Sequence, residues 1–236
     1  MRISVILGHP RPDSFNHALA ATAVEATRAA GHEVRFHDLQ AEGFDPVLPA
    51  GEETASAPVP PMIDLHCREI VEANGIVIVH PNWWGMPPAI LTGWIDRVLR
   101  PDVAYRFEER DSGEGTPVGL LCARSAVVFN TSNTLPDREA SVFGDPLERI
   151  WKDCIFGLCG VSNVERQTFG VIVTSTPAQR WAWLEQVRAT VARHFPRESS
   201  PTGDCYQGHP EQPMTDHGVA AARPGVHVGL HRLPSP

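Results

Sequence analysis

The chain has 236 residues, with 28 Asp and Glu against 20 Lys and Arg, so its formal net charge is −8. This acidic balance argues against a nucleic-acid partner, which usually meets a basic patch. Hydrophobic residues make up 42% of the chain and charged residues 20%. That composition is typical of a globular protein and excludes a chain that is disordered throughout.

No apolar run approaches the roughly 18 to 20 residues that a bilayer core demands, so we expect no membrane insertion. The apolar run 3–7 is too short for the core of a signal peptide and leads directly into Gly8, so we expect a cytoplasmic location. The five cysteines contain no C-x-x-C pair. We therefore expect reduced thiols, most of them buried in the core.

The first part of the chain alternates between strand and helix patterns. Residues 2–7 form a short apolar strand candidate. A helix should follow, capped by Ser14 and ended by Gly31, and the next strand is 33–38. The stretch 40–61 is rich in Pro, Gly, Glu and Ala and is long for a connection, so it is expected to be a loop.

The middle of the chain repeats the alternation. The pattern predicts a helix over 62–74 and then a fully buried strand over 76–79. A loop covers 80–87, and Pro88 is well placed as the first residue of the next helix. The polar stretch 101–117 is expected to be a loop.

The last part of the chain contributes two strands and two helices. A fourth strand is expected at 126–130 and a fifth at 169–173. One helix should open at Asp145 followed by Pro146, and the last helix at Thr176. The side chains expected to face inward from these helices include Cys154 and Trp181.

Five strands that alternate with helices imply parallel βαβ units with right-handed crossovers. The fold class is therefore α/β, a doubly wound three-layer sandwich whose strand order the alternation alone does not decide. We assign 1–195 to this domain. Residues 196–236 are dominated by Pro, Gly, Ser and His, and we expect them to form a tail outside the core.

Ligands of open parallel sheets bind beyond the carboxyl ends of the strands, so the loops at those ends are the candidate site. The loop after the first strand leads to a helix N-terminus, where His9, Ser14 and Asn16 supply polar side chains and Arg11 a positive charge. This combination indicates an anion site. The alternative is that Ser14 only caps the helix and that His9 is a surface residue.

Two further loops carry unusual residues. Adjacent tryptophans, Trp83 and Trp84, follow the buried strand, and a planar ring system would stack on such exposed aromatics. The alternative is that one packs under the helix and the other lies in a dimer interface. The loop over 130–134 presents small polar side chains suited to the edge of a heterocycle, although the same residues are common in ordinary turns.

The segment 82–98, Asn-Trp-Trp-Gly-Met-Pro-Pro-Ala-Ile-Leu-Thr-Gly-Trp-Ile-Asp-Arg-Val, and His9 with Ser14-Phe15-Asn16 together carry a resemblance. Over residues 1–195 the chain resembles the NAD(P)H:quinone oxidoreductase family of flavodoxin-like flavoproteins. The resemblance implies a flavodoxin-like sheet in the order 2-1-3-4-5. It also implies cofactor-binding residues in three groups, namely His9, Phe15 and Asn16 beside the capping Ser14, then Pro81, Asn82, Trp83 and Trp84, then Asn130, Thr131, Ser132 and Asn133.

The first group would hold the phosphate portion of a flavin nucleotide, and the other two would line the edges of its ring. The resemblance implies FAD, with FMN as the alternative, and NADPH or NADH as the reductant. Hydride would pass in a ping-pong cycle from the nicotinamide through flavin N5 to a quinone or similar two-electron acceptor. Family members are homodimers with shared active sites, so a homodimer is expected here.

Two points limit the resemblance. Animal members use a Tyr and a His after the fourth strand, and 135–150 contains neither, so no catalytic acid is named. Asn133 and Thr134 stand where the family carries small residues.

Two alternative functions stay open: a regulatory ancillary subunit of a potassium-efflux transporter, and a flavoenzyme acting on a biosynthetic intermediate. No metal site is expected, because histidines scattered in a Pro-rich tail are usually solvated.

Overall fold

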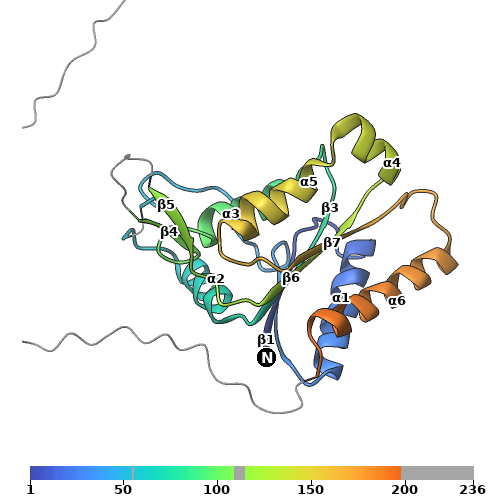
Figure 1. The fold of residues 1–236 in the computed structure, drawn as a ribbon, viewed down its shortest axis with the longest axis horizontal. Coiled ribbons are helices and arrows are strands. Elements are labelled where there is room, and N and C mark those ends of the chain that lie inside the picture. Colours follow the sequence, from blue (N-terminus) through green and yellow to red (C-terminus); the bar gives the residue numbers. More distant parts are fainter. Residues whose placement is uncertain (55, 109–114, 198–236) are drawn as a thin grey trace, which may run out of the picture. The chain divides into compact units, whose positions relative to one another are not determined.

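The computed structural model describes residues 1–54, 56–108 and 115–197. Five parallel strands form its main sheet in the order β2-β1-β3-β6-β7 (Figure 1). Counted within the sheet, this is the expected order 2-1-3-4-5. Among the described residues, no helix combines the length and the apolar character needed to cross a membrane. Most of the predicted tail lies outside the described residues.

The strands of the main sheet are β1 (Arg2–Leu7), β2 (Glu33–Asp38), β3 (Gly75–Pro81), β6 (Ser125–Thr131) and β7 (Val164–Phe169). The α-helices are α1 (Phe15–Ala29), α2 (Pro61–Glu72), α3 (Ala89–Val98), α4 (Pro136–Arg138), α5 (Pro146–Arg149) and α6 (Pro177–His194). Two π-helical segments, η1 (Glu139–Phe143) and η2 (Ile150–Gly157), continue α4 and α5.

The sheet is buried on both faces because its central strands are apolar at nearly every position. In β1, Val5 and Leu7 belong to the core under α1 and α6, whereas Ile6 belongs to the core under α2, α3 and η2. Side chains alternate between the faces of a strand, so a continuous apolar run serves both layers. Figure 1 shows α1 and α6 on one side of the sheet and α2, α3 and α5 on the other.

Helix ends follow the signals expected from the sequence. The Ser14 side chain accepts a hydrogen bond from the His17 N–H at the start of α1, and Gly31 after that helix has a φ of 87°. Thr176 and Gln179 form a capping box at the start of α6. Because α1 directly follows β1 in the chain, its capped N-terminus lies toward the carboxyl end of β1.

The long connection between β2 and α2 is a loop as predicted, and α3 anchors it. Arg97 donates two hydrogen bonds to the Glu52 carboxylate, each 2.8 Å long, and a third to the Asp45 carbonyl at 2.7 Å. Gly93 lets this loop approach, because a Cβ at that position would lie 2.1 Å from the Pro46 carbonyl oxygen. The connection is therefore fixed to the body of the domain at two places.

The prediction of the fifth strand is wrong. The strand is Val164–Phe169, so it ends where the prediction began. Its side chains are mostly half-buried, because β7 is an edge strand, and the apolar run chosen from the sequence forms the loop after it. The polar stretch 101–117 also contains structure, an antiparallel pair of strands β4 (Tyr105–Glu108) and β5 (Thr116–Gly119), with 109–114 outside the described residues.

Three single-residue expectations differ from the structure. Cys154 is exposed rather than buried, whereas Cys159 is buried. Trp181 is 65% exposed. Asp145 precedes Pro146 at the start of α5 as expected, but its side chain makes no cap and instead pairs with Arg166. Helical spacing predicts which side chains share a face, but it does not give the width of the buried face, which excludes Cys154 and Trp181. It also does not reveal a tertiary contact such as the one between Asp145 and Arg166.

Candidate functional site

A cavity of about 850 Å³ lies where β1, β3 and β6 end, and it brings the three predicted loops together. Eleven of the twelve predicted residues line it; the exception is Asn130. This clustering follows from topology, because the carboxyl ends of neighbouring parallel strands meet at one edge of the sheet. The loops predicted from the sequence to form the site thus line one cavity.

The N-terminus of α1 opens onto the cavity at Ser14, Phe15 and Asn16. The first N–H groups of a helix have no partner inside the helix and carry a partial positive charge. The Ser14 hydroxyl is already engaged, because it lies 2.8 Å from His17 Nδ1, and His17 Nε2 in turn lies 3.0 Å from the Asp38 carboxylate. Ser14 therefore acts as a cap, and the backbone N–H groups are the donors left for an anion.

The Asn16 side chain is 3% exposed and only half satisfied. Its Nδ2 donates a hydrogen bond of 2.9 Å to the Thr131 hydroxyl, while its Oδ1 is buried without a partner among the described residues. Rotating the amide by 180° would exchange these atoms, so the side chain can offer a ligand either an acceptor or a donor. A buried polar group left unpaired in a cavity wall is a binding feature, since its desolvation is costly otherwise.

His9 forms part of the wall between the first and second loops. Its Nδ1 accepts a hydrogen bond of 3.1 Å from the Arg11 N–H, and its ring centroid lies 6.1 Å from that of Trp83. Burial lowers the pKa of His9, which keeps the imidazole neutral at pH 7. Positive charge in this part of the cavity therefore comes from Arg11 and the helix N-terminus.

Trp83 and Trp84 occupy a tight turn between β3 and α3. The Asn82 N–H donates to the Thr131 carbonyl, which ties this loop to the end of β6, and Trp83 and Met86 exchange backbone hydrogen bonds across the turn. Trp84 has a φ of 58° and is 98% exposed, whereas Trp83 is 44% exposed. A bulky residue at positive φ is strained, and here the strain places an indole in solvent at the cavity rim.

His80, the residue before Pro81, supports this loop from below. It is fully buried; its Nδ1–H donates to the Pro81 carbonyl at 2.8 Å, and its Nε2 accepts the Trp151 indole N–H at 3.0 Å. Burial lowers the pKa of His80 to about 4, so the ring remains neutral. Trp151 and His80 thereby fix the backbone that carries Trp83.

The third loop is held by the segment after β7. The Ser132 N–H donates to the Phe169 carbonyl, and the Val173 N–H to Asn133 Oδ1. Asn130 faces away from the cavity, where its Oδ1 accepts a hydrogen bond of 2.9 Å from Arg166. It is fully buried and supports the loop rather than lining the site.

Sequence reasoning missed a fourth wall of the cavity. It is formed by residues after β6 and after β7, namely Glu139, Val142, Phe143, Pro146 and Ile172. The segment 135–150 contains no Tyr or His, so the family resemblance does not point to it. The spacing of Glu139, Val142 and Phe143, three and four residues apart, is the signal that would have put them on one face of a helical turn.

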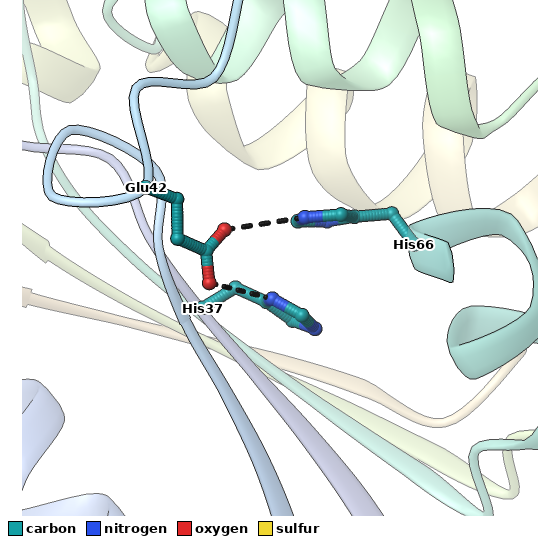
Figure 2. A group of neighbouring side chains, drawn as sticks. All are labelled: His37, Glu42 and His66. Carbon is teal, nitrogen blue, oxygen red and sulfur yellow. Dashed lines mark hydrogen bonds and ion pairs between the residues drawn. The ribbon is translucent and has the colours of Figure 1, made fainter. Parts of the chain in front are cut away.

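A second polar cluster, none of whose residues lines the cavity, brings together side chains from β2, the loop after it and α2 (Figure 2). His37, Glu42 and His66 offer metal-ligand atoms that all lie within 4.8 Å of one another. We name these residues the His37–Glu42–His66 cluster. His37 Nδ1 lies 2.9 Å from Glu42 Oε1, and His66 Nε2 lies 3.2 Å from Glu42 Oε2.

The hydrogen bonds of this cluster argue against a metal ion. The Trp94 indole N–H donates to His66 Nδ1 at 3.0 Å, and because an indole only donates, that nitrogen carries no proton. The N–H of this ring is therefore at Nε2, which faces Glu42, so no lone pair is free there for a metal. His37 is also committed, since its Nε2 lies 2.6 Å from the Glu69 carboxylate.

Charges in the cluster are balanced by pairing. Burial opposes the charge of His37, but hydrogen bonds to Glu42 and Glu69 outweigh it and raise the pKa of His37. Burial likewise opposes the charge of Glu42, but hydrogen bonds from His37 and His66 lower the pKa of Glu42 to about 2. The cluster is a structural element that joins β2, the following loop, α2 and α3.

Comparison with known proteins agrees with this geometry. A family model described as the flavodoxin-like fold matches residues 1–195. The chain belongs to the flavodoxin-like fold family. A protein of Haemophilus influenzae named "Uncharacterized NAD(P)H oxidoreductase" is 33% identical over 186 residues, which are 77% of this chain and 89% of that protein. "NAD(P)H dehydrogenase [quinone] 1" of Rattus norvegicus is 31% identical over 210 residues, 78% of this chain and 74% of that protein. The resemblance to NAD(P)H:quinone oxidoreductases is thus confirmed.

Solved structures of this family have the same architecture. Smu.1420 from Streptococcus mutans is 27% identical with a TM-score of 0.67, and the match covers 82% of this chain and 100% of that one. An NAD(P)H:quinone oxidoreductase from Methanothermobacter marburgensis is 24% identical with a TM-score of 0.71, covering 81% and 97%. At that level of identity the second match supports the fold alone.

Proposed function

We propose that the protein is a flavin-dependent NAD(P)H oxidoreductase that reduces quinones or similar two-electron acceptors. The observation that carries the proposal is the composition of the cavity. It combines unpaired helix N–H groups, an exposed indole and a buried amide with an unsatisfied atom, within a family whose relatives are named NAD(P)H oxidoreductases. A nucleotide with a planar ring and a phosphate group satisfies all three features.

Each part of the cavity has a role toward such a cofactor. The N-terminus of α1, with Arg11 at the rim, would hold the phosphate portion. Trp83 offers a face for the flavin ring, and the loop over 131–133 offers polar groups to its edge. The unpaired Oδ1 of Asn16 would accept a hydrogen bond from the ligand.

A bound flavin supplies the redox chemistry, taking two electrons and a hydrogen from the nicotinamide and passing them to the acceptor. This chain's share is to orient the partners and to exclude water. His80, held neutral by Trp151, fixes the Trp83 loop, and the Asn82–Thr131 hydrogen bond keeps that loop in register with β6. A quinone acceptor would gain this hydride together with a proton from solvent and leave as a hydroquinone.

We propose FAD rather than FMN as the cofactor, because the cavity is near the upper end of the size range of small-molecule sites and its donors suit a diphosphate. We further propose a cytoplasmic homodimer. The indole of Trp84, 98% exposed at the cavity rim, supports this assembly, since a partner subunit would cover it.

The visible spectrum of the purified protein, before and after anaerobic NADPH, tests the function. We expect flavin absorbance that bleaches, with FAD identified by the mass of the released cofactor. Trp83→Ala should weaken flavin binding, whereas Trp181→Ala, at an exposed tryptophan outside the cavity, should leave it unchanged. A colourless protein that takes up no flavin would refute the proposal and favour a regulatory role.

A further inference from the structure

The fourth wall of the cavity contains a carboxylate with no partner. Glu139 is 8% exposed and lines the cavity. Among the described residues, none donates a hydrogen bond to its carboxylate or forms an ion pair with it. Its oxygens are not among the fully buried unpaired atoms of the described residues, so they stay accessible from the cavity and can accept a hydrogen bond from a ligand.

The charges that line the cavity are divided between two segments. Arg11 and the N-terminus of α1 belong to the loop after β1, whereas Glu139 belongs to η1, after β6. His9, the remaining titratable side chain of the lining, has a lowered pKa and is neutral at pH 7. An anionic phosphate is therefore favoured at α1 and disfavoured at η1.

The η1 wall has the chemistry of a site for a flat ring with one polar substituent. Val142 and Phe143 lie three and four residues after Glu139, line the same cavity and are 63% and 54% exposed. An apolar ring can pack on these two side chains while a donor group on the ring meets the carboxylate.

We infer that Glu139 selects the electron acceptor, favouring uncharged aromatic acceptors that carry an N–H or O–H donor and disfavouring anionic ones. This inference rests on the proposed function. An ionised carboxylate only accepts hydrogen bonds, so a donor on the acceptor completes it. A sulfonate or carboxylate on the acceptor would instead place like charges close together in the cavity.

Equilibrium binding to the oxidised holoprotein tests the inference without turnover. The probes are 2-aminoanthraquinone, 2-methylanthraquinone and anthraquinone-2-sulfonate, which share one ring system and do not add to thiols such as the exposed Cys154. Binding is followed by quenching of flavin and tryptophan fluorescence. For the wild type we expect the amino compound to bind roughly tenfold more tightly, and the sulfonate roughly tenfold more weakly, than the methyl compound.

Two variants separate charge from hydrogen bonding. Glu139→Gln removes the charge but keeps an acceptor, so the penalty on the sulfonate should disappear while the preference for the amino compound persists. Glu139→Leu removes both, so both differences should disappear. Glu25→Gln, at a 71% exposed carboxylate on α1, makes the same change in net charge and should keep the wild-type ratios.

Flavin content distinguishes the ways in which the inference can fail. A wild-type protein that binds no flavin would overturn the proposed function and this inference with it. Flavin-replete variants that keep the wild-type binding ratios would overturn the inference alone. Variants that lose flavin affinity and keep the ratios would assign the carboxylate to the cofactor instead, which also overturns it.

Discussion

The cavity and the His37–Glu42–His66 cluster both gather polar side chains, but they satisfy them differently. In the cavity, Asn16 Oδ1 and the Glu139 carboxylate have no partner among the described residues. In the cluster, each ring nitrogen of His37 and His66 faces a carboxylate or an indole N–H, and Glu42 Oε2, which accepts no hydrogen bond of good geometry, still lies 3.2 Å from His66 Nε2. Both sites contain residue types that bind ligands, so residue type alone does not distinguish them.

The difference teaches how to separate a binding site from a structural network. Unpaired buried atoms raise the free energy of the ligand-free protein, and binding relieves that cost. Polar atoms that are already paired within the protein stabilise the fold and have no hydrogen bond left to make with a ligand. Variants in the cluster should therefore change the free energy of unfolding, and variants in the cavity should change affinity.

His37→Leu should give the largest effect. It removes the imidazolium between Glu42 and Glu69 and leaves two carboxylates facing an apolar side chain, which should cost about 3 kcal/mol of stability. Urea unfolding of the flavin-free protein measures the loss. The flavin Kd should stay within about twofold of the wild type. Weakened flavin binding in the folded variant would contradict the separation of the two sites.

Asn16→Leu should have the opposite profile. It removes the amide that faces the cavity and should raise the flavin Kd about 30-fold, or about 2 kcal/mol. Stability of the flavin-free protein should change less than flavin affinity, because the lost hydrogen bond to Thr131 is offset by burying an apolar side chain. A variant that loses stability but keeps flavin would place Asn16 among the structural residues.

The pH dependence of stability sharpens the description of the cluster. The raised pKa of His37 contributes stability that is complete below its unfolded value of 6.5 and is lost as the pH rises through the folded pKa. The lowered pKa of Glu42 contributes stability that is complete above 4.5 and is lost as the pH falls toward about 2. The stability difference between wild type and His37→Leu should therefore be largest between pH 4.5 and 6.5. A difference that does not vary from pH 3 to 8 would refute the charge assignment.

Ser14→Ala should have the smallest effect on stability and on flavin affinity. It distinguishes a capping role of Ser14 from a role in ligand binding. Loss of the cap on α1 should cost about 1 kcal/mol of stability. The flavin Kd should change less than threefold, because the hydroxyl is engaged by His17 rather than free for a phosphate. A large loss of flavin affinity would show that Ser14 contacts the cofactor.

The pattern of strands and loops in the sequence predicted three walls of the cavity. The order of the strands in the sheet was predicted from the family resemblance. Apolar runs such as Ile76–Val79 identify buried strands, and the topology then brings the loops that follow them together. Caps at Ser14 and Thr176 were predictable because they depend on neighbouring residues. Local signals thus located most of the site.

The rest depended on contacts between distant residues. The edge strand Val164–Phe169 is mostly polar and half-buried, so its pattern is weaker than that of the apolar loop behind it. Glu139 resembles any surface glutamate until η1 is placed against the cavity. The orientation of the His66 ring depends on Trp94, which lies 28 residues further along the chain and donates a hydrogen bond to His66 Nδ1.

The anchor between Glu52 and Arg97 also has a consequence for the order of folding. The loop between β2 and α2 is synthesised before α3, yet its two attachments, at Pro46 and Glu52, are made to α3. Glu42, near the start of the loop, pairs with His37 and His66 on β2 and α2, but the part around Pro46 and Glu52 gains these attachments only when α3 docks. A nascent chain that stalls before residue 98 would therefore expose the loop to proteases and chaperones, and docking of α3 would withdraw it in a single step.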